Sequence, residues 1–346
     1  MKLSLDEIKL ITVGALDIRE EADGIHFYKC TENQNKAWDK LSETLGFRAR
    51  TTTGVRLDFH TNSKNLKICA KGGKFEIYVD NLLRLQNTVN ELTDTTFELK
   101  DPLGFDKDEY RVTVYLPSHG IGVLSSIEID DKATVTPHDY DIKMLFIGDS
   151  ITQGWNTKYD SLSYAYRVTR FFNANSIIQG IGGAFYHETT FDSLPFEPDV
   201  VLVAYGTNDF GRFKTYDEFM GHVSAHLRLI ASEYSDKQIF VLSPIWRKDL
   251  QERSMGTFDG ARQIVIDEAA KLGLIHIDGL SLVPPIEEFF ADGHLHPNSE
   301  GFSLYAENLI YELKKYITLP QKKQSIQEVA TEILKKYRKA FEELAK

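Results

Sequence analysis

Hydrophobic and polar residues alternate in short runs over the first 140 residues of the chain. The alternation is clearest in four segments, at residues 54–60, 74–80, 110–116 and 122–129. Turn-forming residues separate these segments, among them Gly72-Gly73. Short alternating segments with turns between them are typical of an antiparallel β-sandwich, and we expect only one short helix in this part, at 36–45.

The pattern changes after residue 141, where short apolar runs alternate with longer amphipathic segments. The apolar runs predict strands at 144–147, 176–178, 200–204, 239–242 and 274–277. The amphipathic segments predict helices at 216–234, 258–272 and 301–316, and Gly273 is expected to end the second of them. Alternating strands and helices indicate βαβ units, and therefore a parallel sheet with helices on both faces.

The end of the chain has the pattern of a separate amphipathic helix. Ser325 and Glu328 fit a capping box, and apolar residues then recur at helical spacing. We expect this apolar stripe to pack on its own chain, with a contact between two copies in a homo-oligomer as the alternative. The predicted organisation is a β-sandwich accessory domain at 1–140, an α/β domain at 141–318 and a C-terminal helix at 319–346.

Length and charge limit the functions to consider. A chain of 346 residues is long enough for two domains with a sizeable core each. The formal net charge of −11 argues against nucleic acid or an anionic membrane as the main partner. No apolar stretch approaches the roughly 20 residues that span a bilayer, and no apolar signal segment is visible near Met1. We therefore expect a cytoplasmic protein in which Cys30 and Cys69 are reduced.

Four polar clusters follow apolar runs, at residues 148–152, 180–183, 205–209 and 292–301. The carboxyl ends of parallel strands meet at one edge of a sheet, where open α/β sheets bind their ligands. The clusters contain a serine, a glycine-rich turn, an asparagine and histidines. Ester hydrolysis through serine needs a nucleophile, a base, a group that orients the base, and donors for the developing oxyanion.

Each cluster taken alone also has an ordinary structural explanation. Ser150 could be a helix N-cap, and Asn208 could form a turn or cap a helix. The pair His294 and His296 could also belong to a metal site. This alternative is disfavoured because no further cluster of Cys and His with ligand spacing accompanies the pair. The four clusters together favour Ser150 as the nucleophile and a histidine as the base.

With these motifs the chain resembles the SGNH hydrolases, also called the GDSL esterase family. Four blocks carry the resemblance, at 148–152, 180–183, 206–209 and 296–301. It implies that Ser150 is the nucleophile and His296 the base. It also implies that the oxyanion is held by the backbone N–H groups of Ser150 and Gly183 and by the Asn208 amide. No metal or organic cofactor is implied.

The chain departs from the family pattern at two positions. The family usually has its aspartate three residues before the histidine, where this chain has Gly293, and Asp292 lies one residue further back. Either the loop holds one extra residue and Asp292 still orients His296, or the site is a dyad that uses a backbone carbonyl. The second block often begins with asparagine, where this chain has Ile178 or Gln179.

The resemblance implies a flavodoxin-like catalytic domain behind a jelly-roll-like β-sandwich, as in some carbohydrate esterases and related acyl transferases. Trp155 and Trp246 follow strand ends and are candidates for stacking on a sugar ring, with core packing as the alternative. The expected function is hydrolysis of short acyl esters, acetyl esters above all, on a carbohydrate, a step that rests on family analogy. The alternatives are an acyltransferase that uses the same residues and a glycan-binding protein that has lost activity.

Overall fold

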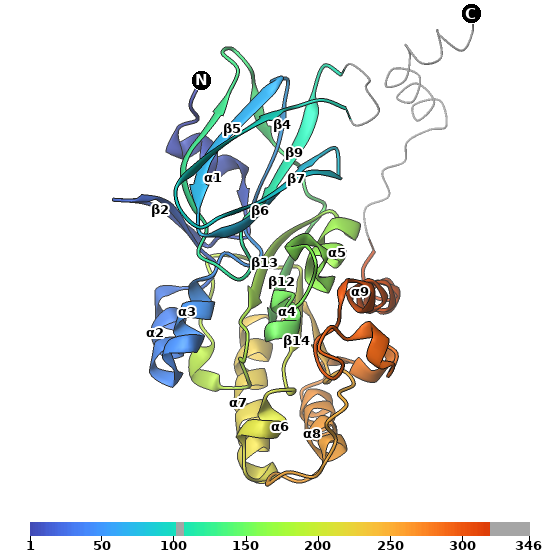
Figure 1. The fold of residues 1–346 in the computed structure, drawn as a ribbon. Helices are drawn as coiled ribbons and strands as arrows, with labels where there is room; N and C mark the ends of the chain where they lie inside the picture. The colour runs from blue at the N-terminus through green and yellow to red at the C-terminus, as the bar shows by residue number, and fades with distance from the viewer. Residues whose placement is uncertain (102–106, 319–346) are drawn as a thin grey trace, which may run out of the picture.

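The computed structural model describes residues 1–101 and 107–318, which form two parts (Figure 1). The first part contains two antiparallel sheets, and the second contains a parallel sheet with helices on both faces. The fold class predicted from the sequence is confirmed. The domain limits of 1–140 and 141–318 stay a prediction, and the predicted helix at 319–346 lies outside the described residues.

The two antiparallel sheets enclose an apolar core that includes Leu57, Leu66, Val112 and Ile127, all fully buried. One sheet has the order β1 (Thr12–Val13), β4 (Arg56–Thr61), β9 (Tyr110–Tyr115), β6 (Gly73–Val79) and β7 (Leu82–Val89), with β11 (Val135–Pro137) also paired to β4. The other has the order β2 (Asp17–Glu21), β3 (Gly24–Tyr28), β10 (Val123–Ile129), β5 (Asn65–Lys71) and β8 (Thr93–Glu98). The four predicted strands correspond to β4, β6, β9 and β10.

Three helices interrupt this first part, namely α1 (Leu5–Ile11), α2 (Glu32–Leu41) and α3 (Glu43–Arg50). The prediction of a single helix at 36–45 is wrong. Ser42 has an extended backbone that ends α2, and its side chain caps α3 by accepting from the Leu45 N–H at 3.3 Å. Apolar side chains of α2 and α3, including Trp38 and Leu45, join the core of the parallel sheet. Figure 1 shows both helices beside that sheet.

The parallel sheet has the strand order 2-1-3-4-5, which is the flavodoxin-like order. Its strands are β13 (Ala174–Gly180), β12 (Ile142–Gly148), β14 (Val200–Ala204), β15 (Gln238–Leu242) and β16 (Ile275–Ile277). The central strands are almost continuously apolar because both faces of the sheet are buried. Gly148 pairs with both Gly180 and Ala204, so three strand ends lie level at one edge of the sheet.

Helices cover both faces of the parallel sheet. One face packs against α7 (Tyr216–Glu233) and α8 (Phe258–Lys271), and the other against α5 (Tyr164–Phe171) and α9 (Ser299–Leu313). The short helices are α4 (Ser150–Gln153), η1 (Asp160–Leu162), η2 (Glu188–Thr190), α6 (Asp209–Arg212), η3 (Gly279–Ser281) and η4 (Glu287–Phe289). No helix within residues 1–101 and 107–318 is long and apolar enough to cross a membrane.

Candidate active site

Ser150 is the first residue of α4, and only Asp149 separates it from the end of β12. The Asp149 carboxylate caps this helix by accepting from the Ile151 N–H at 2.9 Å. Only 6% of Ser150 is exposed, and its Oγ lies 2.8 Å from Nε2 of His296. The structure therefore brings the predicted nucleophile and the predicted base into hydrogen-bond contact across 146 positions of the sequence.

The loop between Asp292 and His296 accommodates the unusual spacing of these two residues. Oδ2 of Asp292 lies 2.6 Å from Nδ1 of His296. Oδ1 accepts from the backbone N–H groups of His294, Leu295 and His296 at 3.0, 2.8 and 3.1 Å. Gly293 has a φ of +71°, a conformation that favours glycine, and this lets the chain turn tightly with one extra residue. Of the alternatives for this loop, the geometry matches the one in which Asp292 orients His296.

The same hydrogen bonds set the charges of the site. Burial opposes a charge on Asp292, but the N–H group of Leu295, the His296 ring and two further N–H groups outweigh it and hold the pKa of this carboxyl well below its ordinary value. Burial lowers the pKa of His296, and the hydrogen bond to Asp292 opposes that shift only in part. His296 is therefore unprotonated near neutral pH, which is the state that a general base needs.

This shift predicts the pH dependence of the reaction. Protonated His296 cannot accept the Ser150 proton, so kcat/KM should fall as the pH is lowered through the His296 pKa. Because that pKa lies below the ordinary value of 6.5, the half-maximal point should lie below pH 6.5. Hydrolysis of p-nitrophenyl acetate, followed from about pH 4 to pH 8, tests this. A half-maximal point at or above pH 7 would contradict the environment described for His296.

The glycine-rich turn at the end of β13 is held from two sides. The guanidinium of Arg48, on α3, donates to the carbonyl of Gly182 at 2.8 Å, and Oε1 of Gln153 accepts from the Gly182 N–H at 2.8 Å. Gly183 follows with a φ of +83°, and a Cβ there would lie 3.1 Å from Nη1 of Arg48. The backbone of Gly183 thus has a conformation that other residues rarely adopt.

Asn208 lies between the glycine-rich turn and the serine turn. Its Nδ2 donates to the carbonyl of Ala184 at 2.9 Å and lies 3.5 Å from Oδ2 of Asp149. Among the described residues, the Asn208 side chain does not cap α6, so the helix-capping alternative does not account for it. The carboxylate of Asp209 holds the neighbouring backbone instead, by accepting from the Tyr186 and Gly206 N–H groups at 2.9 Å each.

A buried lysine lies beneath this edge of the sheet. Nζ of Lys29 is within hydrogen-bond distance of the carbonyl oxygens of Arg48 (3.0 Å) and Gly180 (3.2 Å) and of two threonine hydroxyls. Burial lowers the pKa of Lys29 to about 7. Gln179, one of the two residues at the position where the family often has asparagine, donates to the carbonyl of Lys29 at 3.0 Å. This residue therefore ties β13 to the amino-terminal part of the chain.

The two predicted tryptophans have different surroundings. The ring of Trp155 lies 6.3 Å from the ring of His296 and 5.0 Å from that of His119, and the Arg48 guanidinium lies 5.1 Å from its centre. Trp246 is half-buried, and its ring lies 4.9 Å from that of Phe290. Trp155 is thus next to the catalytic candidates. The contacts of Trp246 match the core-packing alternative, and its role in binding stays a prediction.

The part of the chain that contains the candidate catalytic residues is similar to a known protein family. Residues 146–304 match the model of the GDSL-like lipase/acylhydrolase family. This part of the chain, the GDSL-like domain, belongs to that family. The matched segment of the GDSL-like domain begins within β12 and ends within α9, so it contains Ser150, Gly183, Asn208, Asp292 and His296. No curated protein matches the chain in sequence.

Solved structures share the fold of the GDSL-like domain together with the part that precedes it. The salicylyl-acyltransferase SsfX3 from a tetracycline biosynthetic pathway is 16% identical, with a TM-score of 0.80 over 92% of this chain and 99% of its own. A family two carbohydrate esterase from Cellvibrio japonicus is 14% identical, with a TM-score of 0.63 over 91% and 97%. One from Clostridium thermocellum, solved in complex with cellohexaose, is 18% identical, with a TM-score of 0.58 over 76% and 92%. At these identities the likeness shows a common fold.

Proposed function

We propose that the chain is a serine esterase that removes short acyl groups, acetyl above all, from a carbohydrate. The observation that carries the proposal is the chain of hydrogen bonds from Ser150 Oγ to His296 Nε2, at 2.8 Å, and from His296 Nδ1 to Asp292, at 2.6 Å. A nucleophile, a base and an orienting carboxylate in this order form the arrangement by which serine hydrolases cleave esters. Membership of an acylhydrolase family agrees with it.

In the first half of the proposed reaction, Ser150 forms an acyl-enzyme. Ser150 Oγ attacks the ester carbonyl while His296 Nε2 takes its proton, and Asp292 stabilises the positive charge that forms on the ring. The backbone N–H groups of Ser150 and Gly183 and the Asn208 amide donate to the oxyanion. When the tetrahedral intermediate collapses, the C–O bond to the sugar breaks, and His296 returns the proton to the leaving alcohol.

The second half repeats these steps with water as the nucleophile. His296 takes a proton from water, the hydroxide attacks the acyl carbonyl, and the Ser150 ester bond breaks as His296 gives the proton back to Oγ. The products are the free acid and the unmodified enzyme.

A carbohydrate leaving group is proposed on two grounds. Family two carbohydrate esterases have the same fold, and one of them was solved with cellohexaose. The ring of Trp155 lies beside His296, and an aromatic face there suits stacking against a sugar ring. The acetyl group is proposed from the family resemblance.

Replacing Asn208 by alanine tests the proposed oxyanion donors. An oxyanion donor acts mainly on the transition state, so kcat should fall by roughly 100- to 1000-fold while KM changes little. Steady-state kinetics on p-nitrophenyl acetate would measure this, and the thermal midpoint of the variant would show whether loss of the bond to Ala184 loosens the fold. A change confined to KM would mean that Asn208 only binds substrate.

Two assays test the proposed function. Purified protein should release p-nitrophenol from p-nitrophenyl acetate faster than from p-nitrophenyl octanoate, and it should release acetate from acetylated oligosaccharides. Ser150→Ala is the matched control for both assays. Release of acetate that is unchanged in this variant would contradict the proposed esterase, and a clear preference for the octanoate would contradict the short acyl chain.

The second candidate function is acyl transfer with the same groups. It is favoured by the likeness to the salicylyl-acyltransferase SsfX3, which extends over 92% of this chain. Here the hydroxyl of an acceptor replaces water in the second half of the reaction. Analysis of products with and without a sugar acceptor distinguishes the two functions, because transfer yields an acylated sugar and hydrolysis yields free acid.

A further inference from the structure

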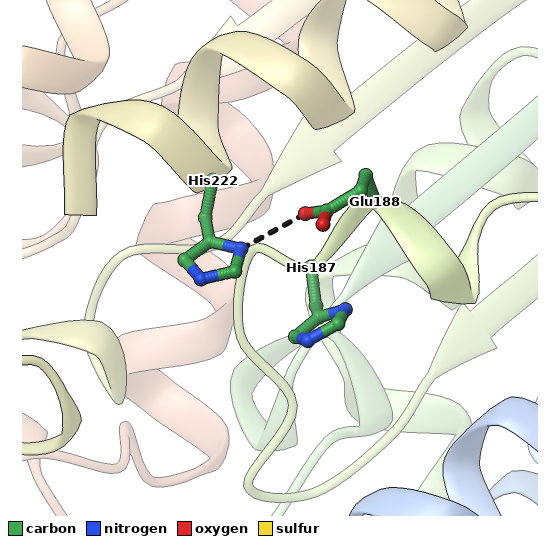
Figure 2. Close-up of side chains that lie close together, drawn as sticks. All are labelled: His187, Glu188 and His222. Atoms are coloured by element: carbon green, nitrogen blue, oxygen red, sulfur yellow. Dashed lines mark hydrogen bonds and ion pairs between the residues drawn. The ribbon is translucent and has the colours of Figure 1, made fainter. Parts of the chain in front are cut away.

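Two histidines and a glutamate lie close together, and none of them is among the catalytic candidates. His187 and Glu188 belong to the start of η2, and His222 lies on α7. Each offers one ligand atom, and these three atoms all lie within 4.8 Å of one another. Figure 2 shows the His222 and His187 rings next to each other and the Glu188 carboxylate turned toward His222. Nδ1 of His222 lies 2.8 Å from this carboxylate.

The donor atoms suit a borderline transition metal. Imidazole nitrogen and carboxylate oxygen are both good ligands for Zn²⁺, and two histidines with one glutamate form a known set of three protein ligands. Three protein ligands leave one tetrahedral position for water. Exposure of 26% for the His222 side chain and 37% for Glu188 gives water access to that position.

The surroundings of the three side chains restrict their orientation, as supporting groups do in metal sites. Nδ1 of His187 lies 2.8 Å from the Thr189 hydroxyl oxygen and 3.4 Å from the Thr189 backbone nitrogen. In the tautomer in which Nδ1 donates its proton to that hydroxyl, Nε2 of the same ring is left to bind a metal. The His222 ring is stacked on His187 at 4.9 Å and on Phe213 at 4.9 Å. The backbone carbonyl of His187 accepts from Nδ1 of His226 at 3.0 Å.

We propose that His187, Glu188 and His222 bind one divalent transition-metal ion, zinc above all. The metal replaces the hydrogen bond between Glu188 and His222, and small side-chain movements bring the three ligands to coordination distance. The chain between Gly183 and His187 leads from the candidate oxyanion turn to the proposed site. The ion therefore fastens the segment that follows this turn to α7. It takes no part in the ester chemistry, so the proposal stands apart from the proposed function.

Metal binding is measured directly, on the full chain treated with a chelator and then desalted. Titration with ZnCl₂ should show one tight equivalent, and Co²⁺ should give the visible absorption of a tetrahedral site. His187→Ala and His222→Ala should each weaken that equivalent by about 100-fold or more, because loss of even a supporting partner costs 10- to 100-fold. Zinc should raise the thermal midpoint of the unaltered protein by about 2–5 °C, and this rise should disappear in both variants.

Two further variants keep the test decisive. Glu188→Gln keeps the shape of the side chain, so it should fold and still lose most of the zinc affinity. His26→Ala is the matched control, because Glu21, Asp23 and His26 form the other such group among the described residues. This variant should keep the tight equivalent. Zinc bound near Asp292 and His296 would remain in all four variants. The test therefore concerns the zinc equivalent that is lost when His187, Glu188 or His222 is replaced. The proposal is overturned if the unaltered protein binds no tight equivalent, or if the His187 and His222 variants retain it.

Discussion

Replacing Ser150 by alanine should lower kcat for p-nitrophenyl acetate on the order of 10⁶-fold, as expected when the nucleophile of a serine hydrolase is removed. The side chain is small and almost completely buried at the start of α4, so alanine fits the same space. The fold should therefore remain, which circular dichroism and the thermal midpoint would check. Near-normal turnover by a folded Ser150→Ala variant would disprove the proposed mechanism.

His296→Ala should be nearly as damaging as Ser150→Ala, because the two residues act as one unit. The double variant should then be little worse than either single variant, which is the mark of groups that act together. His294→Ala is the matched control. Its side chain is 45% exposed and its ring lies near the carbonyl of Asp292, whereas His296 is the ring that bonds to Ser150. An active His296→Ala with an inactive His294→Ala would reverse the assignment of the base.

The strands predicted from the sequence have a side-chain pattern that follows from burial, although β3 and β5 also alternate and were not predicted. The runs at 144–147 and 200–204 are continuously apolar because helices cover both faces of their sheet. In the sandwich, β9 and β10 have buried faces and were recognised from alternation. By contrast, β8 is largely exposed and mostly polar, so no hydrophobic pattern marks it, and the half-buried β7 has no regular alternation. Burial creates the pattern, and exposed strands therefore leave none.

The helices near the amino terminus show a second limit. The apolar positions around residues 36–45 suggested one helix, but Ser42 divides this region between α2 and α3. A serine is compatible with a helix interior and with an N-cap, and its extended backbone is decided by how both helices pack on the parallel sheet. Tertiary contacts thus determine a boundary that local preference leaves open.

The residues of the candidate site also divide into those that the sequence predicted and those that it did not. Ser150 follows the end of β12, so its place at the edge of the sheet could be predicted from topology. Asp292 and His296 lie in the loop between η4 and α9 and not at a strand end, so their meeting with Ser150 was predicted from the family motif. Arg48 and Lys29 could not be predicted, because their contacts with Gly182 and Gly180 join positions 134 and 151 residues apart. These contacts depend on the way the amino-terminal part packs against the parallel sheet.

Asp292→Asn should lower kcat on the order of 10⁴-fold, by analogy with other catalytic triads. Oδ1 of Asp292 accepts from three backbone N–H groups, and an asparagine oxygen can do the same, so the loop should keep its shape. The amide nitrogen would then face Nδ1 of His296. That ring nitrogen would have to accept instead of donate, which moves the ring proton to Nε2, where it opposes removal of the Ser150 proton.

The pH profile and a second substitution separate this effect from a loss of structure. Asp292 raises the pKa of His296, so the acid limb of kcat/KM should move to lower pH in Asp292→Asn. Asp292→Ala removes the loop acceptor as well and should also lower the thermal midpoint. A loss of about tenfold or less in a well-folded Asp292→Asn variant would instead show that Ser150 and His296 work as a dyad. The 2.6 Å contact between Asp292 and His296 favours the larger loss, because a charge-assisted bond of this length fixes both the tautomer and the orientation of the base.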